Sequence, residues 1–220
     1  MAMIENYAGW SYCEFISAFR DRFGSIKQFI RIGTSDRSRS YADEWGNKSV
    51  IGIGWPAVGS LEKYAAGDGL DREAIASELK INYYSTDART ASRKAGELIR
   101  FYYSDSNTVF VAMAGEQPLA LVDNIGKYFY DDSSDMPNRK PGKWHYCFGA
   151  GDALPSKSEG KQTSCYQLTD VDNLMYLYEK YYYGSDGAVD DIGDGSVSAV
   201  VETNYREKFC RWMRLQVKPE

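Results

Sequence analysis

The stretch TVFVAMAGEQPLALVDNIG, residues 108–126, decides the fold. Its first part, Thr108 to Ala114, consists almost entirely of apolar and β-branched residues, which is typical of a β-strand. Gly115 and Glu116 form a tight-turn signal, and Leu119 to Gly126 is predicted to return as the antiparallel partner. We therefore expect a central β-hairpin, around which the other elements pack.

Further strands and several helices flank this hairpin. The other predicted strands are Gln28–Ile32, Ser49–Gly54, Tyr128–Asp132, Lys143–Phe148 and Ser164–Leu168. Apolar residues at helical spacing predict helices over 11–24, from Asp71, from Thr86 or Asp87, and from Asp170 to Gly184. Residues 33–48 and 133–142 are polar and are predicted to be irregular loops. This alternation predicts an α+β domain.

Composition limits the kind of protein this is. The 220 residues carry a net charge of −5, which argues against a protein that simply coats DNA. Five acidic residues and no Lys or Arg fall in 184–202, so the rest of the chain is neutral and local basic patches can act there. Four widely spaced cysteines and a single histidine predict neither disulfides nor a zinc site. We expect a cytoplasmic protein without a secretory signal, a membrane span or a cofactor.

Motifs that would indicate catalysis are missing from the sequence. The glycines of 52–59 precede no Lys-Ser or Lys-Thr pair, so they do not form a phosphate-binding loop. His145 stands alone, and a packed or surface histidine is the favoured interpretation. Asp123 is the only acid in the two predicted strands of the hairpin, and no pair of the kind found in nucleases follows it. We therefore predict no catalytic residue and no metal site.

Aromatic residues are more informative. Trp55 ends a glycine-rich strand and precedes Pro56, where a ring can project over a pocket, although packing against a helix is an equal alternative. Trp45 lies in a polar loop, where core packing explains a large ring less well. Tyr128 and Tyr130 share one face of their predicted strand.

Basic residues cluster near these aromatic positions. A solvated protein face is the alternative interpretation for each cluster. Aromatic rings that stack on a base, beside Arg and Lys for phosphate, are nevertheless what holding an extruded nucleotide requires. The candidate phosphate-binding residues are Arg37 and Arg39, Arg89, Arg93 and Lys94, and Arg139, Lys140 and Lys143.

The order of the predicted elements over residues 25–170 resembles that of the PUA-related EVE and YTH domains. These include N-terminal modules of McrB-type modification-dependent restriction proteins. The resemblance implies a twisted, partly closed β-barrel flanked by helices, with an aromatic cage for a modified base. It implies that Trp55 is a cage wall, that Tyr128 and Tyr130 lie on the aromatic-acidic strand, and that Arg139 and Lys140 are the basic pair before the next strand. Trp45, Tyr64 and Trp144 compete for the second wall.

The resemblance also divides the chain. Residues 1–24 are expected to be a helical extension outside the family pattern, and 25–183 the base-binding domain. An acidic, mobile Gly/Asp linker at 184–203 and a C-terminal segment at 204–220, which would suit fusion to a further domain, complete the division.

The expected function is a non-catalytic module that recognises a modified base, with methylation as the expected modification, in a restriction or defence system. Its partners would be nucleic acid, DNA in the first instance, and a motor or nuclease that performs the chemistry. Two alternatives stay open: a small metal-dependent nuclease or hydrolase with an unrecognised carboxylate site, and an adaptor that binds proteins through its tyrosine-rich surface.

Overall fold

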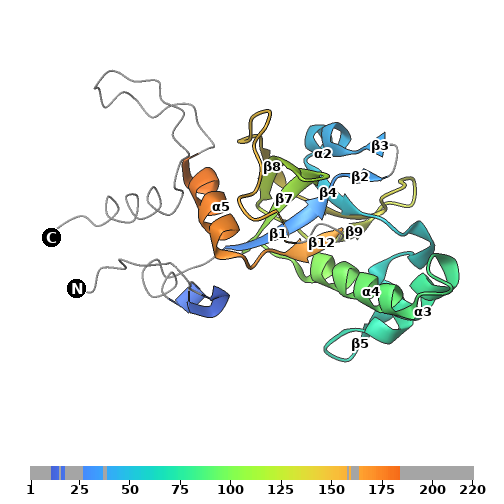
Figure 1. Ribbon diagram of the computed structural model, residues 1–220. Coiled ribbons are helices and arrows are strands. Elements are labelled where there is room, and N and C mark those ends of the chain that lie inside the picture. Colours follow the sequence, from blue (N-terminus) through green and yellow to red (C-terminus); the bar gives the residue numbers. More distant parts are fainter. Residues whose placement is uncertain are drawn as a thin grey trace, which may run out of the picture.

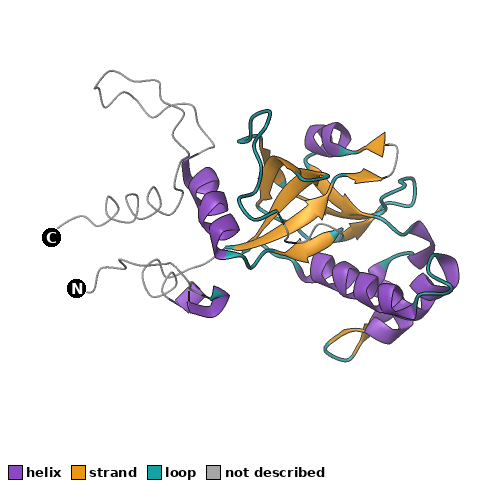
Figure 2. Cartoon of the chain, viewed as in Figure 1, coloured by secondary structure: helices purple, strands orange, loops and turns teal. Residues whose placement is uncertain are grey.

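The computed structural model describes residues 11–14, 16–17, 27–36, 39–157, 159 and 164–183. These residues form the predicted α+β architecture, in which strands gather at the centre and helices lie around them (Figure 2). Residues 12–14 and 16–17 are helical, and the Glu14 carboxylate accepts a hydrogen bond from the Ser11 amide at 2.7 Å, which is the geometry of a capping box. The predicted linker at 184–203 and the segment 204–220 lie outside the described residues.

A five-stranded sheet organises the domain (Figure 1). In spatial order its strands are β11 (Lys143–His145), β8 (Gln117–Asp123), β7 (Thr108–Ala114), β1 (Gln28–Gly33) and β12 (Cys165–Gln167). The predicted hairpin is the β7–β8 pair, and its register is shifted by an irregularity at Ala112/Met113. The β1–β7 pair is parallel and the other pairs are antiparallel.

Both faces of this sheet are buried, which explains why its central strands are apolar almost throughout. Along β7, Phe110 and Ala112 belong to one hydrophobic core, while Val109, Val111 and Met113 belong to a second core. This alternation follows from the two-residue repeat of side chains along a strand. The sheet therefore separates two cores.

Helices cover each face of the sheet (Figure 1). The first core contains residues of α3 (Arg72–Asn82) and α4 (Ala88–Tyr103), and the second contains residues of α5 (Val171–Tyr183). The Asp71 and Asp87 carboxylates cap α3 and α4, as their positions before each apolar repeat predict. Asp170 accepts hydrogen bonds from two amides in the first turn of α5.

Smaller elements lie beside the first core. A three-stranded sheet has the order β4 (Val50–Ile53), β10 (Asn138–Pro141) and β9 (Phe129–Tyr130). The remaining short elements are β2 (Ser35–Asp36), β3 (Arg39–Ser40), α2 (Ala42–Lys48), η1 (Pro56–Val58), η2 (Leu61–Tyr64), β5 (Ala65–Ala66) and β6 (Gly69–Leu70). Among the described residues, no sheet closes into a barrel.

Two of the predicted loops are wrong in part. Residues 33–48 contain a short hairpin and the helix α2. This helix packs against β4, and local sequence propensity does not predict that contact. The second half of 133–142 is strand β10, which pairs antiparallel with β4 so that Lys140 faces Ile51 across the ladder. This pairing brings Arg139 and Lys140 into the protein, where they are 2% and 3% exposed.

Within the described ranges, no helix has the length and apolar character needed to cross a bilayer.

Lys140 gives the fold a measurable pH dependence. Burial lowers the pKa of Lys140 to about 8, and its ammonium donates to the Ser104 carbonyl. An unfolded chain keeps this proton up to a pKa of about 10.4, so unfolding takes up a proton between these two pH values. We therefore expect the free energy of unfolding to rise with pH across this window, relative to a Lys140→Met variant.

Urea unfolding of both proteins at several pH values between about 7 and 10.5 measures this difference. A free-energy difference between wild type and variant that stays constant across the window would contradict the burial of a titrating lysine.

Candidate functional site

A cavity of about 820 Å³ opens beside Trp55. It lies among the end of β4, the β2–β3 hairpin, the residues after α3, and α4. Its volume falls within the range of about 300–1,000 Å³ typical of sites for small organic ligands. Its lining combines aromatic and charged side chains: Tyr41, Trp55, Tyr83 and Tyr84, with Asp36, Arg39, Lys94 and Asp135.

Trp55 is held in this lining by an unusual backbone conformation. Its φ of 65° and ψ of 63° are left-handed, which is rare for a bulky residue and costs about 1–3 kcal/mol. The indole Nε1 donates to the Tyr84 hydroxyl at 3.0 Å, and the Trp55 carbonyl accepts from the Val58 amide at 3.0 Å. Part of the ring also packs against the first core. These contacts stabilise a conformation that the chain would otherwise leave.

Lys94 reaches the cavity from α4, although it is only 7% exposed. Its Nζ lies 5.5 Å from the centroid of the Trp55 ring, 3.1 Å from the Glu97 carboxylate and 3.3 Å from Ser164 Oγ. Burial lowers the pKa of Lys94, and the Glu97 carboxylate opposes that shift. The side chain thus places a hydrogen-bond donor beside the Trp55 ring, within cation–π range.

Charged residues from the β2–β3 side complete the lining. The Arg39 guanidinium pairs with Asp135 at 2.9 Å and with Glu44 at 2.8 Å, and lies 4.7 Å from the Tyr41 ring centroid. Asp36 lines the cavity from the same hairpin. The cavity therefore offers acceptors and donors around its aromatic surface.

The sequence interpretation missed Tyr83 and Tyr84. They follow α3 directly, and their rings lie 6.3 Å apart. The Tyr83 hydroxyl accepts from the Ala57 amide at 2.9 Å, so both tyrosines tie the end of α3 to the segment that carries Trp55. The adjacent tyrosine pair was visible in the sequence, but only the tertiary fold brings it to Trp55.

The three candidates for a second cage wall do not line this cavity. Trp45 on α2 is fully buried, so the expectation that its ring is exposed is wrong. The ring fits because Gly52 has no side chain, since a Cβ at Gly52 would lie 3.1 Å from the ring. Tyr64 is buried and donates to a main-chain carbonyl at 2.9 Å. The indole of Trp144 likewise donates to a main-chain carbonyl, at 2.8 Å.

Tyr128 lies apart from Trp55, whereas Tyr130 lies at the border of the Trp55 cavity. Tyr128 donates to Asn138 at 2.7 Å and lines a different cavity of about 500 Å³. Tyr130 lies closer, with its hydroxyl 3.4 Å from the carbonyl of Pro56, a residue that does line the Trp55 cavity. The aromatic surface at the cavity is therefore built from Trp55 and tyrosines other than those the resemblance implies.

The predicted phosphate-binding residues separate into several groups. Arg39 and Lys94 line the cavity, whereas Arg37 lies outside the described residues. The Arg139 guanidinium is paired inside the protein with Glu44 at 3.1 Å and Asp131 at 3.2 Å, so its charge is already compensated. Lys140 is also buried, but it lines the cavity of about 500 Å³ beside Tyr128. The prediction of Arg139 as a surface phosphate contact is therefore wrong, whereas phosphate binding by Lys140 stays a prediction. The remaining predicted residues are exposed, namely Lys143 on β11 and Arg89 and Arg93 on α4.

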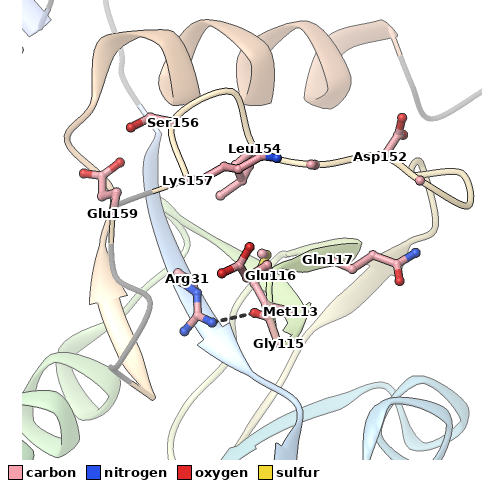
Figure 3. Close-up of a pocket in the computed structure, with 12 residues that line it drawn as sticks. Arg31, Met113, Gly115, Glu116, Gln117, Asp152, Leu154, Ser156, Lys157 and Glu159 are labelled. Atoms are coloured by element: carbon pink, nitrogen blue, oxygen red, sulfur yellow. Dashed lines mark hydrogen bonds between the residues drawn. The ribbon is translucent and has the colours of Figure 1, made fainter.

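A second cavity of about 220 Å³ lies on the opposite face of the sheet, below the loop that carries Asp152 and Ser156 (Figure 3). Arg31 lies at its floor and donates to the Gly115 carbonyl at 2.7 Å (Figure 3). The Glu159 carboxylate at its rim already accepts hydrogen bonds from Thr169, Asp170 and Asn173. Its volume is below the usual range for a ligand site.

His145 is part of a small polar cluster. Its Nε2 lies 2.9 Å from Asp123 Oδ1, and the Tyr181 hydroxyl donates to the other oxygen of that carboxylate at 2.9 Å. The cluster joins β8, β11 and α5, so His145 is a packed residue, one of the two alternatives favoured from the sequence. No group of three or more His, Cys, Asp or Glu residues in the described part of the chain is placed to hold a metal ion.

Comparisons of the chain with protein-family models, with curated proteins and with solved structures find no match.

The two central tryptophans should differ in their effect on stability. Trp45→Ala is expected to lower the free energy of unfolding by about 3–5 kcal/mol, because it leaves a cavity in a closed core. Trp55→Ala should cost clearly less, since that ring is only partly buried. Urea unfolding followed by circular dichroism measures both values, and an equal loss in the two variants would show that Trp55 is a core residue.

Proposed function

We propose that this chain is a non-catalytic module that binds nucleic acid and holds one modified base, methylated in the first instance, in the Trp55 cavity. The observation that carries the proposal is the partly buried Trp55 ring, kept in a strained left-handed conformation at the wall of a cavity of about 820 Å³. Strain of this kind persists where the surrounding structure fixes it, and it is concentrated at functional sites.

Stacking is the first reason to choose a base as the ligand. A base taken out of a strand loses its neighbours, and an aromatic ring replaces them with about 1–3 kcal/mol per base. Trp55 presents such a ring, and Tyr84 orients it through the hydrogen bond at 3.0 Å. Tyr83, which is exposed, lines the same cavity and adds a further aromatic ring.

The charged groups of the lining support recognition of a polar base edge. A methyl group adds only about 0.8 kcal/mol of apolar burial, so it discriminates weakly by itself. Lys94 supplies a donor, and Asp36 and Asp135 supply acceptors, around the same space. Together they could read the edge of the base while the ring holds its face.

The α+β architecture is compatible with the PUA-like EVE and YTH domains, and we include that relationship in the proposal. DNA is the proposed carrier of the base, and the cytoplasm the proposed compartment. Because the module would perform no chemistry, a motor or nuclease acting in restriction or defence is the proposed partner.

Removing the Trp55 ring should abolish the preference for a modified base. We expect Trp55→Ala to weaken binding of the preferred oligonucleotide by about 1–3 kcal/mol and to equalise modified and unmodified sequences. Titrations of a panel of single- and double-stranded oligonucleotides, unmodified or with one modified base, measure this change.

Tyr146→Ala is the matched control, since that ring is 63% exposed and does not line the cavity. The control should keep both affinity and preference. Base preference that survives intact in folded Trp55→Ala protein would exclude the Trp55 cavity as the site.

A further inference from the structure

A basic groove of about 760 Å³ lies along α4, beside the start of α3 and strand β12. Four arginines line it: Arg72, Arg89, Arg93 and Arg100. Among the described residues of the lining, the single acidic side chain is Glu97, which is buried. In a chain with a net charge of −5, this local excess of positive charge calls for a physical explanation.

Local sequence explains how the arginines come together. Arg89, Arg93 and Arg100 share one face of α4, because residues three and four apart are neighbours on a helix. Arg72 crosses from α3 and donates to the Ser92 carbonyl at 3.1 Å. The Arg72 guanidinium passes close to Gly96, where an added Cβ would lie 3.4 Å from it, about van der Waals contact.

The charge of the groove is largely uncompensated. Glu97 already interacts with Arg93 at 3.2 Å, with Lys94, and with the main-chain amides of Ser164 and Cys165. Arg72 and Arg100 donate to main-chain carbonyls, which are neutral. Within the described ranges, no acidic side chain forms an ion pair with Arg72, Arg89 or Arg100.

The groove adjoins the Trp55 cavity. Lys94 and Ser164 line the cavity, whereas Glu97 and Cys165 line the groove. The Ser164 amide donates to Glu97 at 2.8 Å, and Lys94 contacts both Glu97 and Ser164. One ion-pair cluster therefore forms the wall between the two spaces.

We propose that this groove holds the phosphodiester backbone of the same strand whose base enters the Trp55 cavity, a proposal that rests on the proposed function. Arginine suits this ligand, because its planar fork of donors matches phosphate oxygens. The distance from Arg89 to Arg100 is roughly 16 Å along the helix axis at 1.5 Å per residue. A single phosphate group is too small to contact arginines along that whole length. A nucleic-acid strand can contact them all, because it carries a phosphate about every 3.4 Å of duplex axis. Tyr166 adds a partly exposed ring for a neighbouring nucleotide.

The test compares two double variants of the full chain that lose the same charge. Arg72→Gln/Arg89→Gln removes two exposed groove arginines, and Lys63→Gln/Lys127→Gln removes two exposed lysines that line neither space. Oligonucleotides with and without one modified base are titrated over a series of salt concentrations. Arg89→Gln, which breaks no ion pair or side-chain hydrogen bond within the described residues, serves as a second groove variant that should leave the fold intact.

The groove double variant should weaken binding of modified and unmodified oligonucleotides by the same factor, because backbone contacts carry no base information. The dependence of log K on log salt should become shallower by about 1 for each arginine removed. The lysine control should keep the wild-type slope. Equal effects in both double variants would overturn the groove, since net charge alone would then explain the loss.

The outcomes separate the groove from the function of the cavity. Wild-type protein that prefers a modified base, combined with groove variants that bind normally, would overturn the groove and leave the function intact. Binding that depends on the groove arginines but shows no base preference would support the groove and reject the base reader. No binding of any oligonucleotide by the wild type would overturn both.

Discussion

The buried carboxylate of Glu97 is the constraint on which the arrangement of both candidate surfaces depends. A buried charge is stable only when hydrogen-bond donors surround it, and Glu97 is surrounded by two amides at β12 and by the side chains of Lys94 and Arg93. These contacts fix α4 against the edge of the large sheet. They also place Lys94 on the side of the Trp55 cavity and Arg93 on the side of the groove, so one structural requirement sets the positions of two sets of cations.

Trp55 is the second constraint, and it acts through the backbone. The chain must leave β4, turn through a left-handed residue and continue into η1 at Pro56. Tyr84 and Tyr83 hold this turn from the end of α3, by contacting the Trp55 indole and the Ala57 amide. Hydrogen bonds thus hold this turn of the cavity wall in place without a ligand, and a preformed site reduces the entropy lost on binding.

Local sequence patterns predicted the elements whose signals are strong. The β7–β8 hairpin, the start of one helix at Asp71 and of the next at Thr86 or Asp87, and the apolar stripes of α3 and α4 all agree with the structure. Position in space was harder to predict than element type. Trp45 lies in a polar stretch, yet a gap above Gly52 admits its ring to the core, and no spacing rule encodes such a gap.

In the candidate site, too, the position of residues in space was harder to predict than the type of element that carries them. Trp55, Arg39 and Lys94 were predicted and do line one cavity, whereas Tyr83, Tyr84 and Asp135 come from segments that only the tertiary fold unites. Arg139 was predicted to contact phosphate because it lies in a basic cluster just after Tyr130 and matches the basic pair of the resembling family. The pairing of β10 with β4 instead buries it next to Glu44 and Asp131. Strand pairing between distant segments decides such cases, and one sequence does not reveal it.

The central claim is that the Trp55 ring contacts a base, and indole nitrogen–proton correlation spectra test it most directly. The chain has five tryptophans, so its indole signals are few, and Trp55→Phe assigns the signal of Trp55. Titration with an oligonucleotide that carries one modified base should shift the Trp55 signal strongly and leave the signal of the buried Trp45 in place. A Trp55 signal that stays unchanged while the oligonucleotide binds would contradict the account.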